Sequence, residues 1–477
     1  MIRRKLPVRS RRVPTPRTRI ERDTMGEVRV PRDALWGAQT ARAVQNFPIS
    51  GLRPHPAFVD ATLRIKIAAA RANASLGLLP RRTARAIERA AREVLAGRWR
   101  DQFVVDVYQA GAGTSHHMNV NEVLAGRARQ LLAGRGGRAV VDANDHVNMA
   151  QSTNDVVPTA IRLAALELAP RVVAALGSLA ATFERKARSW DDVVKSGRTH
   201  LMDATPLTLG QEVGGWAAAL RGAAARVRDA LPELSLLGLG GTAVGTGLNA
   251  HPRYQRLVLA ELSKLTGLPL SPATSLTAAM QSLAPLVALS GALRGAAVEL
   301  LRIGGDVRLL GSGPATGLGE LRLPAVQPGS SIMPGKVNPS MAEMLAMVCY
   351  QVMGLDAAIA AAAAAGQLEL NVMMPLVAFD LCHALQIQGA AVEAFDRRCA
   401  RGLQADRARA RHYAERTVSL ATALAPRLGY ARAAAIVKDS LASGRSIAEL
   451  AVEQGGLTPA QARRLLDPAR LTRPGRG

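Results

Sequence analysis

Residues 327–340, QPGSSIMPGKVNPS, combine two adjacent serines, a lysine and an asparagine with glycines and prolines. A phosphate-binding loop needs four residues between its first glycine and Gly-Lys, and then Ser or Thr to hold magnesium. Here five residues separate Gly329 from Gly335, and Val337 has no oxygen to offer a metal. Pro334 also lacks the backbone N–H that such a loop donates. The sequence therefore argues against a nucleotide loop and leaves two hydroxyls beside one ammonium group.

Four other stretches are rich in glycine and hydrogen-bonding side chains where a helix bundle would favour apolar residues. They are residues 109–122, 143–159, 196–212 and 238–249. At helix ends, such segments can direct backbone N–H groups and hydroxyls at an anion. Each stretch taken alone also has a simpler interpretation. Thr114 and the Ser152–Asn154 segment could be helix N-caps, and Thr199-His200 could be a hydrogen-bonded turn.

Metal and cofactor sites are not predicted. His116 and His117 are adjacent, so on a helix they would point about 100° apart and could not easily share a metal. The sequence has no HExxH motif and no paired CxxC motif. The glycines of 238–249 lack the strand, helix and later acidic residue of a dinucleotide site. We expect neither a metal nor an organic cofactor.

Composition favours a large helical protein. The chain has 477 residues, of which 48% are hydrophobic but only 3% aromatic, and alanine-rich helices pack closely. Three cysteines are too few for a disulfide framework, which predicts a reducing, cytoplasmic setting. No unbroken apolar run is long enough to span a bilayer. The net charge of +24 comes mainly from arginines spread along the chain, so we expect nucleic-acid binding to be unlikely.

Hydrophobic periodicity predicts long helices over most of the chain. The pattern is helical from 57 to about 135, with breaks near 77–80 and at 97. Further long helices are expected over 154–189, 207–229, 273–310 and 341–365, and shorter ones after about 401. Residues 1–20 are strongly basic and lack an apolar signal region, so we predict a disordered extension. A bundle of this length usually completes its core in an oligomer.

Taken together, the polar segments carry one specific resemblance. GSSIMPGKVNP (329–339) closely resembles the signature of the aspartase/class II fumarase branch of the fumarate lyase superfamily. GRTHLMDATPLTLGQE, GGTAVGTGLN, STNDVVPT and GQLELNVMMP also resemble that family's motifs and follow its order. The resemblance implies a mainly α, three-domain fold whose central long-helix bundle forms a multi-subunit helical core. The domains would be 21–150, 151–400 and 401–477, and the active form would be a homotetramer.

The resemblance also implies a reaction and roles for named residues. The reaction is the reversible anti elimination across a four-carbon dicarboxylate that gives fumarate, with each site built from three subunits. Removing a proton beside a carboxylate creates a doubly charged aci-carboxylate, which needs donors that are already in place. The catalytic residues would be Ser330 as base and His200 polarised by Glu343. The substrate-binding residues would be Thr114, Ser152, Thr153, Asn154, Thr199, Ser331, Lys336 and Asn338.

The leaving group decides between two enzymes of this branch. Ser152-Thr153-Asn154, AGQLELNVMMP and QAGAGTS resemble aspartases, whereas LWGAQT and KSGRTHLMDA look at least as fumarase-like. We therefore expect an aspartate ammonia-lyase, with class II fumarate hydratase as the alternative. A non-catalytic relative or a basic nucleic-acid-associated protein is a remote third interpretation. His117 stands where the family usually has asparagine, and it could alter substrate fit or pH profile.

Overall fold

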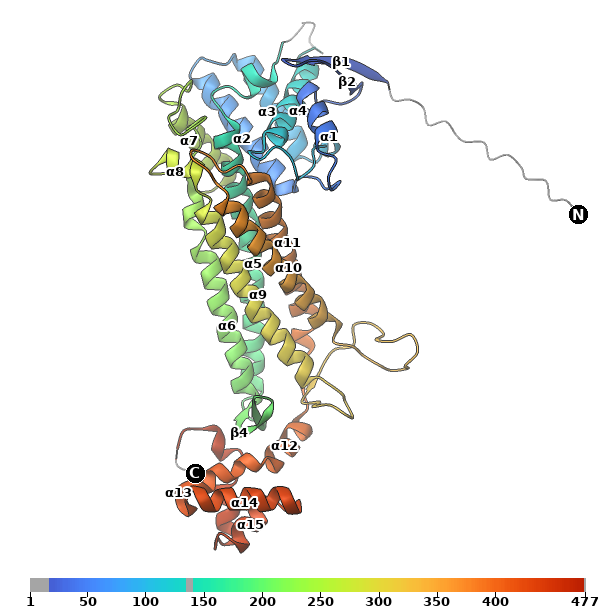
Figure 1. Ribbon diagram of the computed structural model, residues 1–477, viewed down its shortest axis with the longest axis vertical. Helices are drawn as coiled ribbons and strands as arrows, with labels where there is room; N and C mark the ends of the chain where they lie inside the picture. Colours follow the sequence, from blue (N-terminus) through green and yellow to red (C-terminus); the bar gives the residue numbers. More distant parts are fainter. Residues whose placement is uncertain (1–16, 134–139, 476–477) are drawn as a thin grey trace, which may run out of the picture. The chain divides into compact units, whose positions relative to one another are not determined.

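A computed structural model describes residues 17–133 and 140–475 (Figure 1). Most of the described chain is helical, and the mainly α fold predicted from the sequence is confirmed. Of the predicted basic extension, residues 1–16 lie outside the described residues, and Thr18 already begins strand β1 (Thr18–Asp23). The described chain forms two compact units, each built from segments that are not consecutive in sequence. The predicted three-domain division remains a prediction.

The first unit comprises residues up to Glu167 together with Pro232–Val287 and Ala358–Cys382. Its core is formed by apolar faces of α2, α3 and α4, including Leu63, Ile87 and Leu124, which are completely buried. The elements wholly within it are β1, β2 (Gly26–Pro31), α1 (Ala38–Asn46), α2 (Pro56–Ser75), α3 (Arg81–Leu95), α4 (Thr114–Ala133), β5 (Leu236–Leu237), α7 (Tyr254–Thr266), β6 (Ser271–Pro272) and α8 (Leu276–Gln281). Strands β1 and β2 pair in an antiparallel hairpin.

The second unit comprises Leu168–Leu231, Ala288–Ala357 and the chain from His383 onward. Its C-terminal helices enclose a small core that includes Leu424, Ile436 and Leu450. The elements wholly within it are β3 (Val194–Thr199), β4 (Met202–Thr208), α6 (Leu209–Asp229), β7 (Leu321–Arg322), β8 (Gln404–Ala405), α12 (Arg407–Arg416), α13 (Ala425–Leu428), α14 (Tyr430–Ser443), α15 (Ile447–Glu453) and α16 (Pro459–Leu465). Four long helices contribute residues to both units: α5 (Thr153–Ser189), α9 (Ala284–Leu310), α10 (Ser340–Ala364) and α11 (Met374–Arg398).

Within the second unit, α6 runs alongside stretches of α5 and α9 (Figure 1). Phe183 of α5 packs edge-on against Trp216 of α6, with ring centroids 5.4 Å apart. The buried Asp396 of α11 accepts hydrogen bonds from Thr182 Oγ1 (2.7 Å) and Ser178 Oγ (2.8 Å) of α5. The two hydrogen bonds of Asp396 join helices α5 and α11, whose bonded residues are more than 200 positions apart in sequence. The bundle is therefore held by aromatic packing and by satisfied buried polar groups.

The predicted helices agree with α2, α3, α5, α6 and α10 to within a few residues. The helix expected over 273–310 is instead two helices, α8 and α9, because Ser282 between them is extended. Helices α7 and α11 and the β3–β4 hairpin were not predicted from the sequence. The hairpin has polar residues on both faces, so its alternation of apolar and polar side chains is weak.

Three helices are long and apolar enough to cross a membrane by length and composition: α5, α9 and α10. None of these helices is an unbroken apolar run, because a few ionisable residues interrupt each of them. Some of those residues are paired with neighbouring helices. Asp356 of α10, for example, accepts from Ser290 Oγ (2.7 Å) and Arg294 Nε (2.6 Å) of α9.

Phe183 and its half-buried neighbour Glu184 provide a matched test of the bundle core. Phe183→Ala removes a fully buried ring between α5 and α6. We expect it to lower the free energy of unfolding by about 3–5 kcal/mol, measured by urea denaturation. Glu184→Ala removes only a surface ion pair with Arg221, and a cost of about 1 kcal/mol or less is expected. Equal effects of the two changes would contradict this description of the core.

Candidate active site

The serine loop, residues 326–339, joins β7 to α10 and is closed by its own hydrogen bonds. Gly329 N donates to Lys336 O (2.8 Å), and Asn338 Nδ2 donates to Gly329 O (2.7 Å). Ser330 Oγ accepts from two backbone N–H groups, those of Ile332 (3.2 Å) and Met333 (3.0 Å). Two donors directed at one oxygen stabilise negative charge on it. The loop therefore favours the alkoxide that a serine needs in order to act as a base.

Gly329 allows the two ends of the serine loop to meet. A Cβ atom at this position would lie 2.5 Å from Lys336 O and 2.8 Å from Asn338 N. Both contacts are with backbone atoms, which cannot move aside without opening the loop. The glycine is therefore required by close backbone approach.

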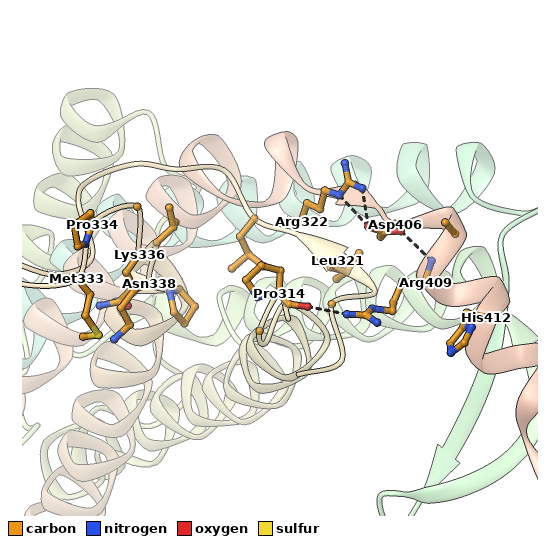
Figure 2. A pocket seen from close by; sticks show the side chains of 18 residues that line it. Pro314, Leu321, Arg322, Met333, Pro334, Lys336, Asn338, Asp406, Arg409 and His412 are labelled. Atoms are coloured by element: carbon orange, nitrogen blue, oxygen red, sulfur yellow. Dashed lines mark hydrogen bonds and ion pairs between the residues drawn. The ribbon is translucent and has the colours of Figure 1, made fainter. Parts of the chain in front are cut away.

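A cavity of about 1050 Å³ adjoins the C-terminal half of the serine loop (Figure 2). Lys336 and Asn338 line one side, and Arg322, Arg409 and His412 line the other. Arg322 is held by Asp406 at 2.7 Å, and Arg409 donates to Pro314 O at 2.8 Å. The Lys336 ammonium is exposed and has no ion-pair partner among the described residues. Its charge is thus available to an anionic ligand.

Thr199 and His200 lie at the tip of the β3–β4 hairpin, and both are exposed. His200 and Leu201 form the turn with φ angles of 57° and 61°. Residues other than glycine rarely adopt this left-handed backbone conformation, and each one that does destabilises the fold by roughly 1 kcal/mol or more. Strained residues of this kind persist where surrounding structure holds them, and they gather at functional sites.

A buried ionic cluster holds the base of this hairpin. Glu320 is completely buried and contacts Arg198 Nη1 at 2.8 Å and Lys195 Nζ at 3.6 Å. Lys195 Nζ also reaches Glu212 Oε1 at 3.2 Å. Burial raises the pKa of Glu212, and the charge of Lys195 opposes that shift. Because Arg198 directly precedes Thr199, this cluster fixes the backbone that presents Thr199 and His200.

A third group of predicted residues lies in the first unit, at the starts of α4 and α5. Thr114 is exposed at the first position of α4, and Ser152, Thr153 and Asn154 are half-buried. Asn154 Nδ2 donates to Ala243 O at 2.8 Å, which joins two of the polar segments singled out in the sequence. A dicarboxylate reaching this group would meet hydroxyl and amide donors.

Asp155 anchors the segment that carries Ser152 and Asn154. Its carboxylate is completely buried and accepts from the backbone N–H groups of Ser152 (2.9 Å), Gly240 (3.0 Å) and Thr242 (3.1 Å). Burial raises the pKa of Asp155 to about 6, against the lowering effect of those hydrogen bonds. Protonation near that pH would weaken its hold on the 238–249 loop.

The described chain does not join all of the predicted residues. No hydrogen bond or ion pair links His200 to Glu343 within the described ranges, and none links Ser330 to either of them. The Ser330–Asn338 group and the Thr199–His200 group both belong to the second unit, and Thr114 with Ser152–Asn154 belongs to the first. The predicted roles of these residues therefore remain predictions.

Two family profiles match the chain. That of the Lyase family covers residues 26–354, and that of the fumarase C C-terminus covers residues 420–473. The class II fumarate hydratase of Thermosynechococcus vestitus is 47% identical over 443 residues, which cover 92% of this chain and 95% of that protein. The class II fumarate hydratase of Thermus thermophilus is 47% identical over 462 residues, which cover 96% and 99%.

Solved structures agree with these relatives. The class II fumarase of Schistosoma mansoni matches with a TM-score of 0.93 at 37% identity, covering 96% of this chain and 99% of that one. The fumarate lyase:delta crystallin of Brucella melitensis, solved bound to cobalt, has a TM-score of 0.91 at 47% identity, covering 96% and 100%. The chain belongs to the fumarate lyase superfamily. The predicted family, fold and lyase class are thus confirmed.

The expectation of an aspartate ammonia-lyase is wrong, because the curated relatives at 46–47% identity are class II fumarate hydratases. One physical reason for the error lies at Thr153. The Thr153 hydroxyl contacts His117 Nδ1 at 2.9 Å. A serine at this position would offer the same hydroxyl. A threonine instead of a serine at position 153 therefore does not show whether ammonia or water is the leaving group.

Several residues that hold the site were missed by sequence reasoning. They are Lys66, Asp155, Lys195, Arg198 and Glu320, all buried or nearly so and all polar. Asp155, Lys195 and Arg198 lie within or directly beside the polar motifs, but Glu320 lies outside them and Lys66 lies in an ordinary helical stretch. Its only sequence signal was a single lysine among the alanines and isoleucines of α2.

Gly329→Ala tests whether the closed serine loop matters for activity. The added methyl group must separate Gly329 from Lys336 and Asn338, so we expect kcat to fall at least about tenfold with little change in thermal stability. Gly215→Ala on α6 is the matched control, because a Cβ there meets nothing within 4 Å. The control should retain activity and gain helix stability of up to about 1 kcal/mol. Full activity of Gly329→Ala would contradict the role of the loop.

Proposed function

We propose that this protein is a class II fumarate hydratase, which interconverts fumarate and malate by adding or removing water. The main support for this proposal is the 47% identity to enzymes of that name over more than nine-tenths of the chain. The serine loop supports the same conclusion, because it carries a hydroxyl that accepts from two N–H groups and, six residues later, the exposed ammonium of Lys336. The substrate would be a small dicarboxylate, and the expected setting is cytoplasmic.

In the malate-to-fumarate direction, the Ser330 alkoxide removes a proton from the carbon beside one carboxylate. The N–H groups of Ile332 and Met333 stabilise that alkoxide before the reaction. The resulting aci-carboxylate is stabilised by Lys336, Asn338 and Thr199. Hydroxide is a poor leaving group and departs as water when protonated. We assign that proton transfer to His200, because an imidazole gives and takes protons near neutral pH.

The proposal includes a homotetramer whose sites each combine residues from three subunits. It is supported by the separation of the predicted residues into groups with no bond between them along one described chain. Under this proposal, Glu343 of one subunit polarises His200 of another. Thr114 and Ser152–Asn154 of a third subunit bind the substrate carboxylate, and Ser331 assists at the serine loop.

Ammonium independence tests the choice of reaction. Purified protein mixed with fumarate in ammonium-free buffer should lose fumarate absorbance, and malate should appear in equal amount, measured by chromatography. Adding ammonium should not produce aspartate. A loss of fumarate that requires ammonium would contradict the hydratase. No loss under either condition would favour a non-catalytic relative.

Ser330→Ala tests the assignment of the base. The substitution removes the hydroxyl to which the Ile332 and Met333 N–H groups donate, and we expect kcat to fall by at least about a thousandfold. Circular dichroism and light scattering should show an unchanged fold and assembly. Ser443→Ala, at the exposed end of α14, is the control and should keep normal turnover. Near-normal activity of Ser330→Ala would refute this role.

A further inference from the structure

Lys66 of α2 is completely buried and lies among three hydrogen-bond acceptors. Its Nζ atom is 2.6 Å from His117 Nε2, 2.8 Å from Gln151 Oε1 and 3.1 Å from Asn148 Oδ1. An ammonium group has three protons and no acceptor. The number of protons therefore equals the number of neighbours, provided that all three neighbours accept.

The two amides are oriented by other bonds, which makes their oxygens the acceptors. Asn148 Nδ2 donates to Gln151 O at 3.2 Å. Gln151 Nε2 donates to Val147 O and Met149 O, both at 3.1 Å. With the NH2 groups occupied in this way, both amide oxygens face Lys66. The third Lys66 proton is left for His117 Nε2, which must then be unprotonated.

The other His117 nitrogen faces Thr153. Nδ1 is 2.9 Å from Thr153 Oγ1. Burial, with the charge of Lys66, lowers the pKa of His117 well below its usual value, so the ring is neutral and carries one proton. Since Nε2 accepts from Lys66, that proton is on Nδ1 and is donated to Thr153 Oγ1.

The Thr153 hydroxyl then keeps its own proton free. Oγ1 has already accepted from His117, and no acceptor for its proton is found in the described part of the chain. Thr153 is half-buried between Ser152 and Asn154, two residues predicted to bind the substrate. A free, oriented O–H group in this position suits a carboxylate oxygen.

We propose that Lys66 and His117 are positioning residues that direct the Thr153 proton toward the dicarboxylate substrate. This inference rests on the proposed function and adds to it a chain of hydrogen bonds with one polarity, from Lys66 through His117 to Thr153. The asparagine usual at position 117 could do the same. Its Oδ1 would accept from Lys66 and its Nδ2 would donate to Thr153. His117 therefore replaces the family residue while keeping the direction of the bonds.

The opposite polarity is the alternative to be excluded. Burial lowers the pKa of Lys66 well below its usual value, although the charge of Asp155 opposes the shift. An uncharged Lys66 could accept a proton from His117 Nε2. Thr153 would then donate to Nδ1, and its proton would not reach the substrate. Both arrangements satisfy the same distances, but they predict different effects of substitutions at His117.

His117→Asn and His117→Asp form the decisive pair, because the two side chains have nearly the same shape. The amide can donate to Thr153, whereas the carboxylate can only accept and turns the Thr153 proton inward. We expect KM for fumarate to be about tenfold higher in the Asp variant than in the Asn variant, with a smaller difference in kcat. Similar KM values in the two variants would overturn the proposal.

The same pair in a Thr153→Val background separates the hydrogen-bond chain from a simple charge effect. Without the hydroxyl, the Asn and Asp variants should differ in KM by less than about threefold. A tenfold difference that persists without the hydroxyl would mean that the new charge repels the substrate, and it would also overturn the proposal. Thr153→Ser should restore the dependence on position 117, because it returns the hydroxyl.

Further measurements separate loss of folding and loss of the proposed activity from a failure of this inference. Thermal unfolding verifies that each variant folds. Should His117→Asp fail to fold, Lys66→Met replaces it, because loss of the ammonium lets Nε2 carry the proton and should raise KM only when Thr153 is present. If the unmodified protein does not hydrate fumarate, the proposed function fails. The variants are then compared by calorimetric titration with succinate, where the same tenfold pattern in Kd supports the chain and its absence refutes it.

Discussion

The proposed reaction depends on one electrostatic constraint. A carbon next to a carboxylate gives up its proton only if the second negative charge created there finds donors already in place. The serine loop would serve both charges of this step: two N–H groups point at Ser330 Oγ, the proposed base, while Lys336 and Asn338 of the same loop would receive the charge on the substrate. Gly329 lets the ends of the loop meet. Backbone donors need little reorganisation during the reaction. The rest of the protein serves to hold such groups rigidly in position.

Buried ionic groups provide that rigidity at two places. Beneath the hairpin, Glu320 gathers Lys195 and Arg198 and supports a turn whose residues have positive φ angles. At the start of α5, Asp155 gathers three backbone N–H groups from two segments. Breaking a buried pair such as that of Glu320 by removing one partner costs about 3–5 kcal/mol. Loss of the Asp155 carboxylate would leave three backbone N–H groups without their acceptor, so each group resists movement of the site residues beside it. Stability and positioning thus depend on the same side chains.

Most of the long helices and the polar segments could be predicted from the sequence, because both have local signals; α11 was the long helix that was missed. Alanine-rich periodic stretches correspond to α5, α6 and α10, and the serine loop was found from its unusual composition. Through-space partners could not be predicted in this way. Lys66 meets His117 across 51 residues, and Asp155 meets Gly240 across 85 residues. The leaving group was misjudged because single letters such as Thr153 were interpreted without knowledge of the side chains that they contact.

In the proposed tetramer, Ser330 and His200 of one active site come from different subunits. Ser330→Ala and His200→Asn proteins, each inactive alone, can be unfolded, mixed in equal amounts and refolded. Random assembly should then give hybrid tetramers in which roughly one quarter of the sites have both residues intact, and hydratase activity should return to about that fraction. Refolding each variant alone should restore none. Absence of activity in the refolded mixture, with tetramers present, would contradict the account.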